Sequence, residues 1–151
     1  MKRREFLKTM GAFGVSAGLP KAKPIDTVRV GVIGLGARGS FHVELLLLLE
    51  GVELKALCDV HPPAAEESAR KCAESGRPRP ALYTEGERAY RALLEREDLD
   101  AVLIATPWRW HTPMAVDAMN AGKHALTEVP AAVTLDECLE LVETQERTGR
   151  N

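Results

Sequence analysis

The chain has 151 residues, of which 45% are hydrophobic and 28% are charged, and its formal net charge is −2. This length suffices for one domain with one buried core, and the composition excludes a disordered or fibrous protein. Residues 1–22 hold five of the 20 Lys and Arg but one of the 22 Asp and Glu, so residues 23–151 carry a net charge of about −6. Such an acidic body, without a basic stripe, excludes nucleic acid as a partner.

The first 22 residues have the pattern of an export leader. A basic head that contains Arg3 and Arg4 precedes a short apolar run, residues 9–19, which is too short to span a membrane. The two arginines, followed by x-Phe-Leu-Lys, resemble a twin-arginine signal, which carries folded proteins out of the cytoplasm. We therefore expect residues 1–22 to be a leader of an exported, periplasmic protein and residues 23–151 to form the folded domain. The alternative is a disordered basic tail on a cytoplasmic protein.

The folded part opens with a β-branched run, Val28–Ile33, which predicts a buried parallel strand. Gly34, Gly36 and Gly39 follow in a G-x-G-x-x-G pattern that leads into a predicted helix, Ser40–Glu50. Strand, glycine turn and helix in this order indicate a dinucleotide-binding fingerprint, in which the helix N-terminus binds the pyrophosphate. The three glycines would allow the tight turn, the close approach of the pyrophosphate and the close packing of helix on strand. The alternative is an ordinary glycine turn.

The second strand is predicted over Val52–Cys58 and ends at Asp59, 20 residues after Gly39. A carboxylate at this place accepts hydrogen bonds from the adenosine ribose and favours NAD over NADP. Asp59 as a turn or cap residue is the alternative. The preceding helix contains five consecutive leucines, residues 45–49, so we expect it to be buried on more than one side.

Strands and helices alternate through the rest of the chain. This pattern predicts an α/β fold, a doubly wound parallel sheet of the Rossmann type with strand order 3-2-1-4-5. The three cysteines form no metal or disulfide pattern and are expected in the core. The predicted elements are helix 64–75, strand 81–84, helix 87–96, strand 100–105 and strand 123–127. The first of these helices has Ala65, Ala69 and Cys72 on one face, and the second uses Tyr90, Leu93 and Leu94. The three cysteines are Cys58, Cys72 and Cys138.

A second unusual segment follows the fourth strand, where Trp108, Arg109, Trp110 and His111 occur in succession. A loop at the carboxyl end of a central strand lies at the switch point where such sheets bind ligands, so this cluster predicts a binding role. The alternative is that the tryptophans only cover the end of the sheet. Thr112 is expected as the N-cap of a helix that reaches residue 121, with proline at the first helical position.

The last predicted helix begins at a capping box, Thr134 to Glu137, after the segment Glu128-Val129-Pro130. Its apolar residues recur at helical spacing, and we expect them to be buried. They are Leu135, Cys138, Leu139 and Val142.

The motifs VGVIGLGARG, CDV and IATPWRWHTPMAVDAMNAGKHALTEVP resemble the NAD-binding half of the Gfo/Idh/MocA oxidoreductase family over residues 27–150. Most members of that family have asparagine where this chain has Trp108, and a catalytic lysine where it has Val129. Loss of that amine puts an ordinary sugar dehydrogenase in doubt. Both departures, with T-P-W-x-W-H-x-P-M, are similar to glycoside hydrolase family 109, NAD-dependent exo-acting glycosidases typified by α-N-acetylgalactosaminidases.

The resemblance implies roles for particular residues. Ala37 and Arg38 would meet the pyrophosphate, Asp59 the adenosine ribose, residues 108–111 the nicotinamide side, and Glu128 and Val129 the nicotinamide ribose. The implied reaction is transient oxidation of the sugar C3 hydroxyl, elimination of the glycosidic oxygen, addition of water and return of the hydride.

The resemblance also implies that a final strand and a C-terminal catalytic domain are missing after residue 151, so the catalytic residues are unknown and a sugar substrate requires a second domain. Three hypotheses remain. The chain is the cofactor half of an exported glycosidase, the cofactor half of a sugar dehydrogenase, or a truncated, catalytically silent NAD-binding module. No membrane span is expected, and a homo-oligomer stays open.

Overall fold

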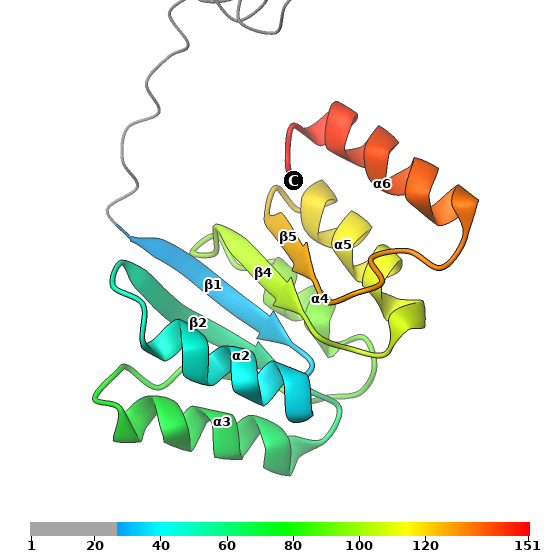
Figure 1. The fold of residues 1–151 in the computed structure, drawn as a ribbon. Coiled ribbons are helices and arrows are strands. Elements are labelled where there is room, and N and C mark those ends of the chain that lie inside the picture. Colours follow the sequence, from blue (N-terminus) through cyan, green and yellow to red (C-terminus); the bar gives the residue numbers. More distant parts are fainter. Residues whose placement is uncertain (1–26) are drawn as a thin grey trace, which may run out of the picture.

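The computed structural model describes residues 27–151, so the predicted leader lies outside the described residues. Five parallel strands form one sheet in the order β3-β2-β1-β4-β5 (Figure 1), which confirms the predicted Rossmann topology. The strands are β1 (Val28–Ile33), β2 (Val52–Cys58), β3 (Ala81–Tyr83), β4 (Ala101–Ile104) and β5 (His124–Thr127).

Helices cover both faces of the sheet, as right-handed crossovers between parallel strands require (Figure 1). Helices α2 and α3 lie on one face and α4 and α5 on the other, while α6 packs against α5 at the β5 side. The helices are α2 (Ala37–Leu47), α3 (Pro62–Glu74), α4 (Ala89–Leu94), α5 (His111–Asn120) and α6 (Leu135–Thr148), with a 3-10 turn η1 (Trp108–Trp110) before α5.

The sheet divides the core into two hydrophobic clusters, one under each pair of helices. The predicted buried faces of α3 and α4 are confirmed, because their apolar side chains are at most 4% exposed. The cluster under α2 and α3 includes Val32, Val43, Leu57, Ala65, Ala69 and Cys72, and the cluster under α4 and α5 includes Ile33, Tyr90, Leu93, Leu94, Val102 and Ala118.

The leucine-rich helix differs from the prediction. Of its residues only Gly39 and Val43 are fully buried, while Leu48 is 80% exposed, so the expected second buried side faces outward. The helix also ends at Leu47 rather than at residue 50. Arg77 stabilises this end, because its guanidinium donates to the carbonyl oxygens of Leu47 and Leu49 at 3.2 and 3.1 Å.

The start of α5 is also different from the prediction. The 3-10 turn leads directly into the helix, so α5 begins at His111 and Trp110 occupies the N-cap position. Thr112 therefore lies inside the helix. Its hydroxyl donates instead to the carbonyl oxygen of Ala131 at 2.9 Å, a tertiary contact that replaces the expected local cap.

At α6 the predicted start is confirmed and the predicted packing is wrong. Thr134 Oγ1 accepts from the Glu137 amide at 3.2 Å, and the Glu137 carboxylate accepts from the Thr134 amide at 3.1 Å, which completes the capping box. The helix meets α5 through partly buried Leu141 and buried Thr144. The residues expected in the core, Leu135, Cys138, Leu139 and Val142, are exposed on its other sides.

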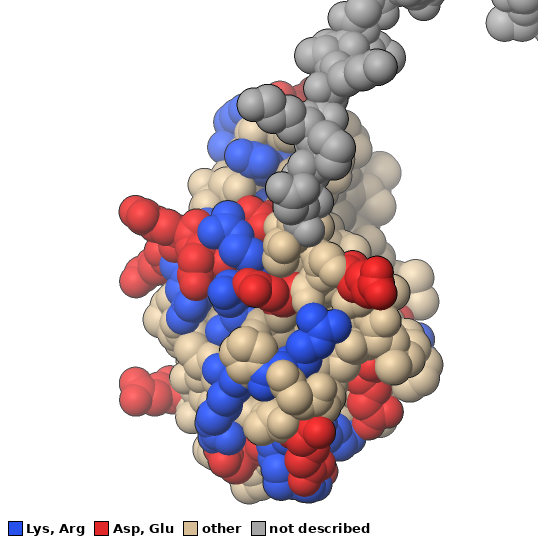
Figure 2. Space-filling view, turned by 90° about the vertical axis from the view of Figure 1, so that its left-hand side faces the viewer, with Lys and Arg blue, Asp and Glu red and all other residues tan. Residues whose placement is uncertain are grey.

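The described surface carries both signs of charge. On the face shown in Figure 2, basic and acidic side chains are intermixed. Within residues 27–151, ion pairs such as that of Arg79 with Glu66 at 2.6 Å neutralise opposite charges locally. Among the helices of residues 27–151, none is long and apolar enough to cross a membrane.

Candidate functional site

The glycine turn after β1 has the geometry that a dinucleotide needs. Gly34 has φ = +87°, and a Cβ there would lie 2.8 Å from the backbone of Ala105, so only glycine fits. A Cβ at Gly39 would lie 1.8 Å from the Gly34 carbonyl oxygen, because α2 packs directly on the turn. Gly36 is different, since a Cβ there would meet nothing within 4 Å. Its lack of a side chain keeps open a space in front of the helix.

That open space lies at the N-terminus of α2, where Gly36 is the N-cap and no side chain caps the helix. The amides of the first helical turn have no partner within the helix, and the helix dipole adds partial positive charge there. This is a ready site for a phosphate group. Ala37 and Arg38, to which the resemblance assigns the pyrophosphate, are the first two residues of this turn, because α2 begins at Ala37 rather than at the expected Ser40.

Asp59 follows β2 and faces the glycine turn. Its Oδ2 accepts from the Leu35 amide at 2.5 Å, and its Oδ1 accepts from the His61 amide at 2.7 Å. Each carboxylate oxygen can accept a further hydrogen bond. Asp59 thus combines the turn role and the place of a ribose acceptor, which the sequence posed as alternatives.

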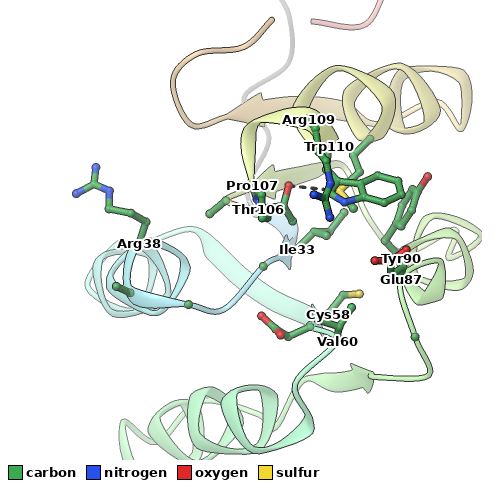
Figure 3. A pocket seen from close by; sticks show the side chains of 17 residues that line it. Ile33, Arg38, Cys58, Val60, Glu87, Tyr90, Thr106, Pro107, Arg109 and Trp110 are labelled. Carbon is green, nitrogen blue, oxygen red and sulfur yellow. Dashed lines mark hydrogen bonds between the residues drawn. The ribbon is translucent and has the colours of Figure 1, made fainter. Parts of the chain in front are cut away.

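A cavity of about 480 Å³ lies over the carboxyl ends of β1, β2 and β4 (Figure 3). This volume is typical of ligand sites. Of the predicted site residues it includes Gly34, Gly36, Ala37, Arg38, Asp59, Arg109 and Trp110, and the other lining residues are Ile33, Cys58, Val60, Gly86, Glu87, Tyr90, Ala105, Thr106, Pro107 and Met114.

Two of the four predicted residues after β4 reach the cavity. Arg109 and Trp110 point into it (Figure 3), whereas Trp108 is 63% exposed and is not among the lining residues. The 3-10 turn explains the difference, because three residues per turn direct successive side chains about 120° apart.

His111 is buried beneath this loop rather than in the cavity. Its Nδ1 lies 2.8 Å from the carbonyl oxygen of Pro130, and its Nε2 lies 2.7 Å from that of Thr106. The ring therefore connects the loop after β4 with the loop after β5.

Glu128, directly after β5, contacts α2 instead of lining the cavity. Its Oε1 accepts from Arg38 Nη2 at 2.9 Å and from His42 Nε2 at 2.5 Å. These two donors, His42 first, hold the pKa of the Glu128 carboxyl below its ordinary value. In Figure 3 the Arg38 guanidinium points away from the other labelled residues, so its backbone rather than its charge faces the cavity. Val129 is 79% exposed beyond this cluster.

Some lining residues were absent from the sequence-based site. Ile33, Cys58 and residues 105–107 end a strand or directly follow one, so the rule that ligands bind at the carboxyl ends of strands could have identified them. Glu87 and Met114 reach the cavity through the packing of α4 and α5, for which the sequence holds no signal.

The cavity is suited to hold a ligand against a largely apolar wall. Burial raises the pKa of the Cys58 thiol to about 12, so this thiol stays protonated and lines the wall without acting as a nucleophile. No group of three His, Cys, Asp or Glu within residues 27–151 is arranged to hold a metal ion. The open space at Gly36, the free amides of α2 and the Asp59 carboxylate together fit a dinucleotide.

Comparison with known proteins agrees with this geometry. The family model described as Gfo/Idh/MocA, oxidoreductase family, NAD-binding Rossmann fold, matches residues 28–151. A glycosyl hydrolase family 109 protein of Shewanella pealeana is 47% identical over 100% of this chain, and an α-N-acetylgalactosaminidase of Shewanella oneidensis is 45% identical over 99% of it. The chain spans 38% of the length of either relative.

Solved structures share the fold. The myo-inositol dehydrogenase of Lactobacillus casei in complex with NAD(H) and myo-inositol is 30% identical, with a TM-score of 0.70 over 80% of this chain and 34% of that one. An NAD-binding oxidoreductase of Klebsiella pneumoniae is also 30% identical, with a TM-score of 0.66 over 82% of this chain and 33% of that one.

Proposed function

The chain belongs to the Gfo/Idh/MocA oxidoreductase family with NAD as its cofactor, and we propose that it is the NAD-binding part of an exported NAD-dependent glycosidase. The reaction is hydrolysis of a terminal glycoside such as an N-acetylgalactosaminide. Relatives with glycosidase names that are 45–47% identical along the whole chain support this proposal.

The observation that carries the proposal is that valine rather than lysine follows Glu128. The dehydrogenase pattern that the sequence resembles places a catalytic lysine there, whereas this chain has Val129, whose exposed apolar side chain cannot exchange a proton. A net dehydrogenation would lack its usual acid/base group at this position. Glycoside cleavage with return of the hydride is the family chemistry that matches this departure.

Bound NAD supplies a reversible oxidation of a sugar hydroxyl, and the residues of this chain hold it in place. The α2 amides would bind the pyrophosphate, Asp59 would accept from the ribose, and the apolar walls of the cavity would contact the rest of the dinucleotide. In glycoside cleavage of this kind the hydride would return to the sugar, so the cofactor would not be consumed. This property suits a protein that works where no nucleotide is supplied.

A chimera tests the glycosidase proposal. The α-N-acetylgalactosaminidase of Shewanella oneidensis, with its corresponding region replaced by this chain, is incubated with NAD⁺ and p-nitrophenyl α-N-acetylgalactosaminide. We expect p-nitrophenol release without net NADH formation. A soluble, NAD-binding chimera that releases no p-nitrophenol would contradict the proposal, and the same relative with its own region is the positive control.

A sugar dehydrogenase is the second candidate, favoured by the structural match to myo-inositol dehydrogenase. Its signature is net NADH accumulation when the chimera is given free sugars, followed at 340 nm. Val129→Lys, which restores the amine of the dehydrogenase pattern, is the informative variant. If it leaves NADH formation at zero, the difference between the two chemistries does not lie at this position.

We also propose that the protein is exported through the twin-arginine route. The support is the Arg3-Arg4 pair ahead of a weakly apolar run. Residues 1–22 fused to a periplasmic reporter should export it in folded form, and Arg3→Lys combined with Arg4→Lys should abolish export. A reporter that stays in the cytoplasm with the unchanged leader would favour the cytoplasmic alternative.

A further inference from the structure

One end of the cavity lies beyond Asp59, on the side away from the glycine turn. Val60 directly after β2, together with Glu87 and Tyr90 from the loop and helix that follow β3, lines this end. Figure 3 shows Glu87 and Tyr90 on one side of the cavity, with Arg109 and Trp110 above and Val60 below. Because Asp59 marks the adenosine ribose, the base that the ribose carries must extend toward these residues.

The walls of this end suit a planar base. The aromatic side chains of Tyr90 and Trp110 and the aliphatic Val60 offer apolar surface, and Tyr90 is held in place because its hydroxyl donates to Asp117 at 2.7 Å. The guanidinium of Arg109 is planar and enters the same space (Figure 3), so this inference places Arg109 and Trp110 at the adenine end rather than at the nicotinamide side, which the resemblance implies for them. Guanidinium planes stack on the faces of nucleobases.

Glu87 is the acidic side chain at this end of the cavity besides Asp59. No ion pair within residues 27–151 involves Glu87 or its neighbour Glu85, so the carboxylate of Glu87 can accept from a ligand in the cavity. An ionised carboxylate only accepts hydrogen bonds. The adenine group that it can recognise is the 6-amino group, which donates.

We propose that Glu87 determines which base the site takes, by accepting a hydrogen bond from the adenine 6-amino group while Arg109 stacks on the ring. The inference rests on the binding of NAD and adds to it a base specificity and the residue responsible. Hypoxanthine carries an oxygen at the same position, which would face the carboxylate as a second acceptor. A hydrogen bond to a charged acceptor at such a partly open site corresponds to about a tenfold preference for adenine.

The test compares two dinucleotides on the whole chain by isothermal titration calorimetry. The probes are NAD⁺ and nicotinamide hypoxanthine dinucleotide, and the quantity of interest is the ratio of their dissociation constants. Glu87→Gln replaces the acceptor by an amide that can also donate to the hypoxanthine oxygen. Loss of a negative charge affects both probes equally, so the ratio cancels it.

Glu85→Gln is the matched control. Glu85 is exposed, lies in the same loop and carries the same charge, but it is outside the cavity lining. Both glutamates are exposed, so the variants are expected to melt at the temperature of the unchanged chain. We expect a ratio of about ten for the unchanged chain and for Glu85→Gln, and a ratio near one for Glu87→Gln.

The outcomes separate this inference from the proposed function. If NAD⁺ binds but Glu87→Gln leaves the ratio unchanged, the role of Glu87 is overturned while NAD binding stands. If the unchanged chain binds both dinucleotides equally, the base specificity itself is overturned. If neither dinucleotide binds at millimolar concentration, NAD binding by this chain fails, and the inference falls with it.

Discussion

Replacement of Gly39 by alanine tests the packing that creates the phosphate site. The added Cβ would lie 1.8 Å from the Gly34 carbonyl oxygen and 2.7 Å from its carbon, and both atoms belong to the backbone. No rotamer change relieves such a contact. To reach even 3.0 Å, the first turn of α2 must move away from the glycine turn by more than an ångström.

The cost of that movement follows from what α2 carries. Val43 lies one turn further along and is fully buried against the sheet, so a shift of the helix disturbs the core cluster under α2 and α3. Overpacking of this kind reduces the free energy of unfolding by about 3 kcal/mol. For a domain of this size that corresponds to a decrease in the melting temperature of roughly 12 °C.

The assay is thermal unfolding followed by circular dichroism, with Gly36→Ala as the matched control. This change is chemically identical, but its Cβ meets nothing within 4 Å and the residue has φ = −64°. Its stability is expected to stay within about 0.5 kcal/mol of the unchanged chain. Its NAD affinity should fall at least about tenfold, because the methyl group enters the space kept for the pyrophosphate. A Gly39→Ala chain that melts within 2 °C of the unchanged one would refute the reasoning.

Three further predictions concern charge, thiols and helix capping. Hydrogen bonds from Arg29 and Arg96 lower the pKa of the Asp100 and Asp98 carboxyls, respectively. The stability that these carboxylates contribute is present above the unfolded pKa of about 3.9 and is lost as pH falls through the lower folded pKa. The melting temperature of Asp100→Asn should therefore fall less steeply below pH 5 than that of the unchanged chain. Of the three cysteines, exposed Cys138 should react with a thiol reagent in the native chain, whereas Cys58 and Cys72, whose pKa values burial raises, should react only after unfolding; mass spectrometry assigns the order. Thr134→Ala removes the capping box and should cost about 1 kcal/mol. Amide exchange in the first turn of α6 should then accelerate while that of β1 stays unchanged.

The sheet was predictable because its signals are local and strong. The strand Val28–Ile33 is bounded by polar residues on one side and glycines on the other. Where strands alternate with helices, each crossover between parallel strands is right-handed, which fixes the topology. The glycine turn and Asp59 were predictable for the same reason, since their spacing places them at adjacent strand ends.

The features that the sequence did not predict depend on contacts between residues far apart in the chain. The apolar stripe of α6 was read as buried, but the part of the helix that meets α5 is set by that neighbour and includes Thr144 rather than Leu139. The hydroxyl of Thr112 has an acceptor 19 residues away, which local capping rules cannot anticipate. Glu87 reaches the cavity because α4, which follows it, packs over the sheet, and no sequence motif indicates this position.

The bridge made by His111 has a mechanical consequence. Because the buried His111 ring contacts the carbonyl oxygens of both Thr106 and Pro130, the loops after β4 and β5 are both connected to one side chain at the start of α5. Thr106 lines the cavity, and Glu128, two residues before Pro130, contacts α2. The His111 ring thus connects the wall of the cavity with the ion-pair cluster of Glu128 and Arg38. The position of either loop therefore depends on the contact that the other loop makes with this ring.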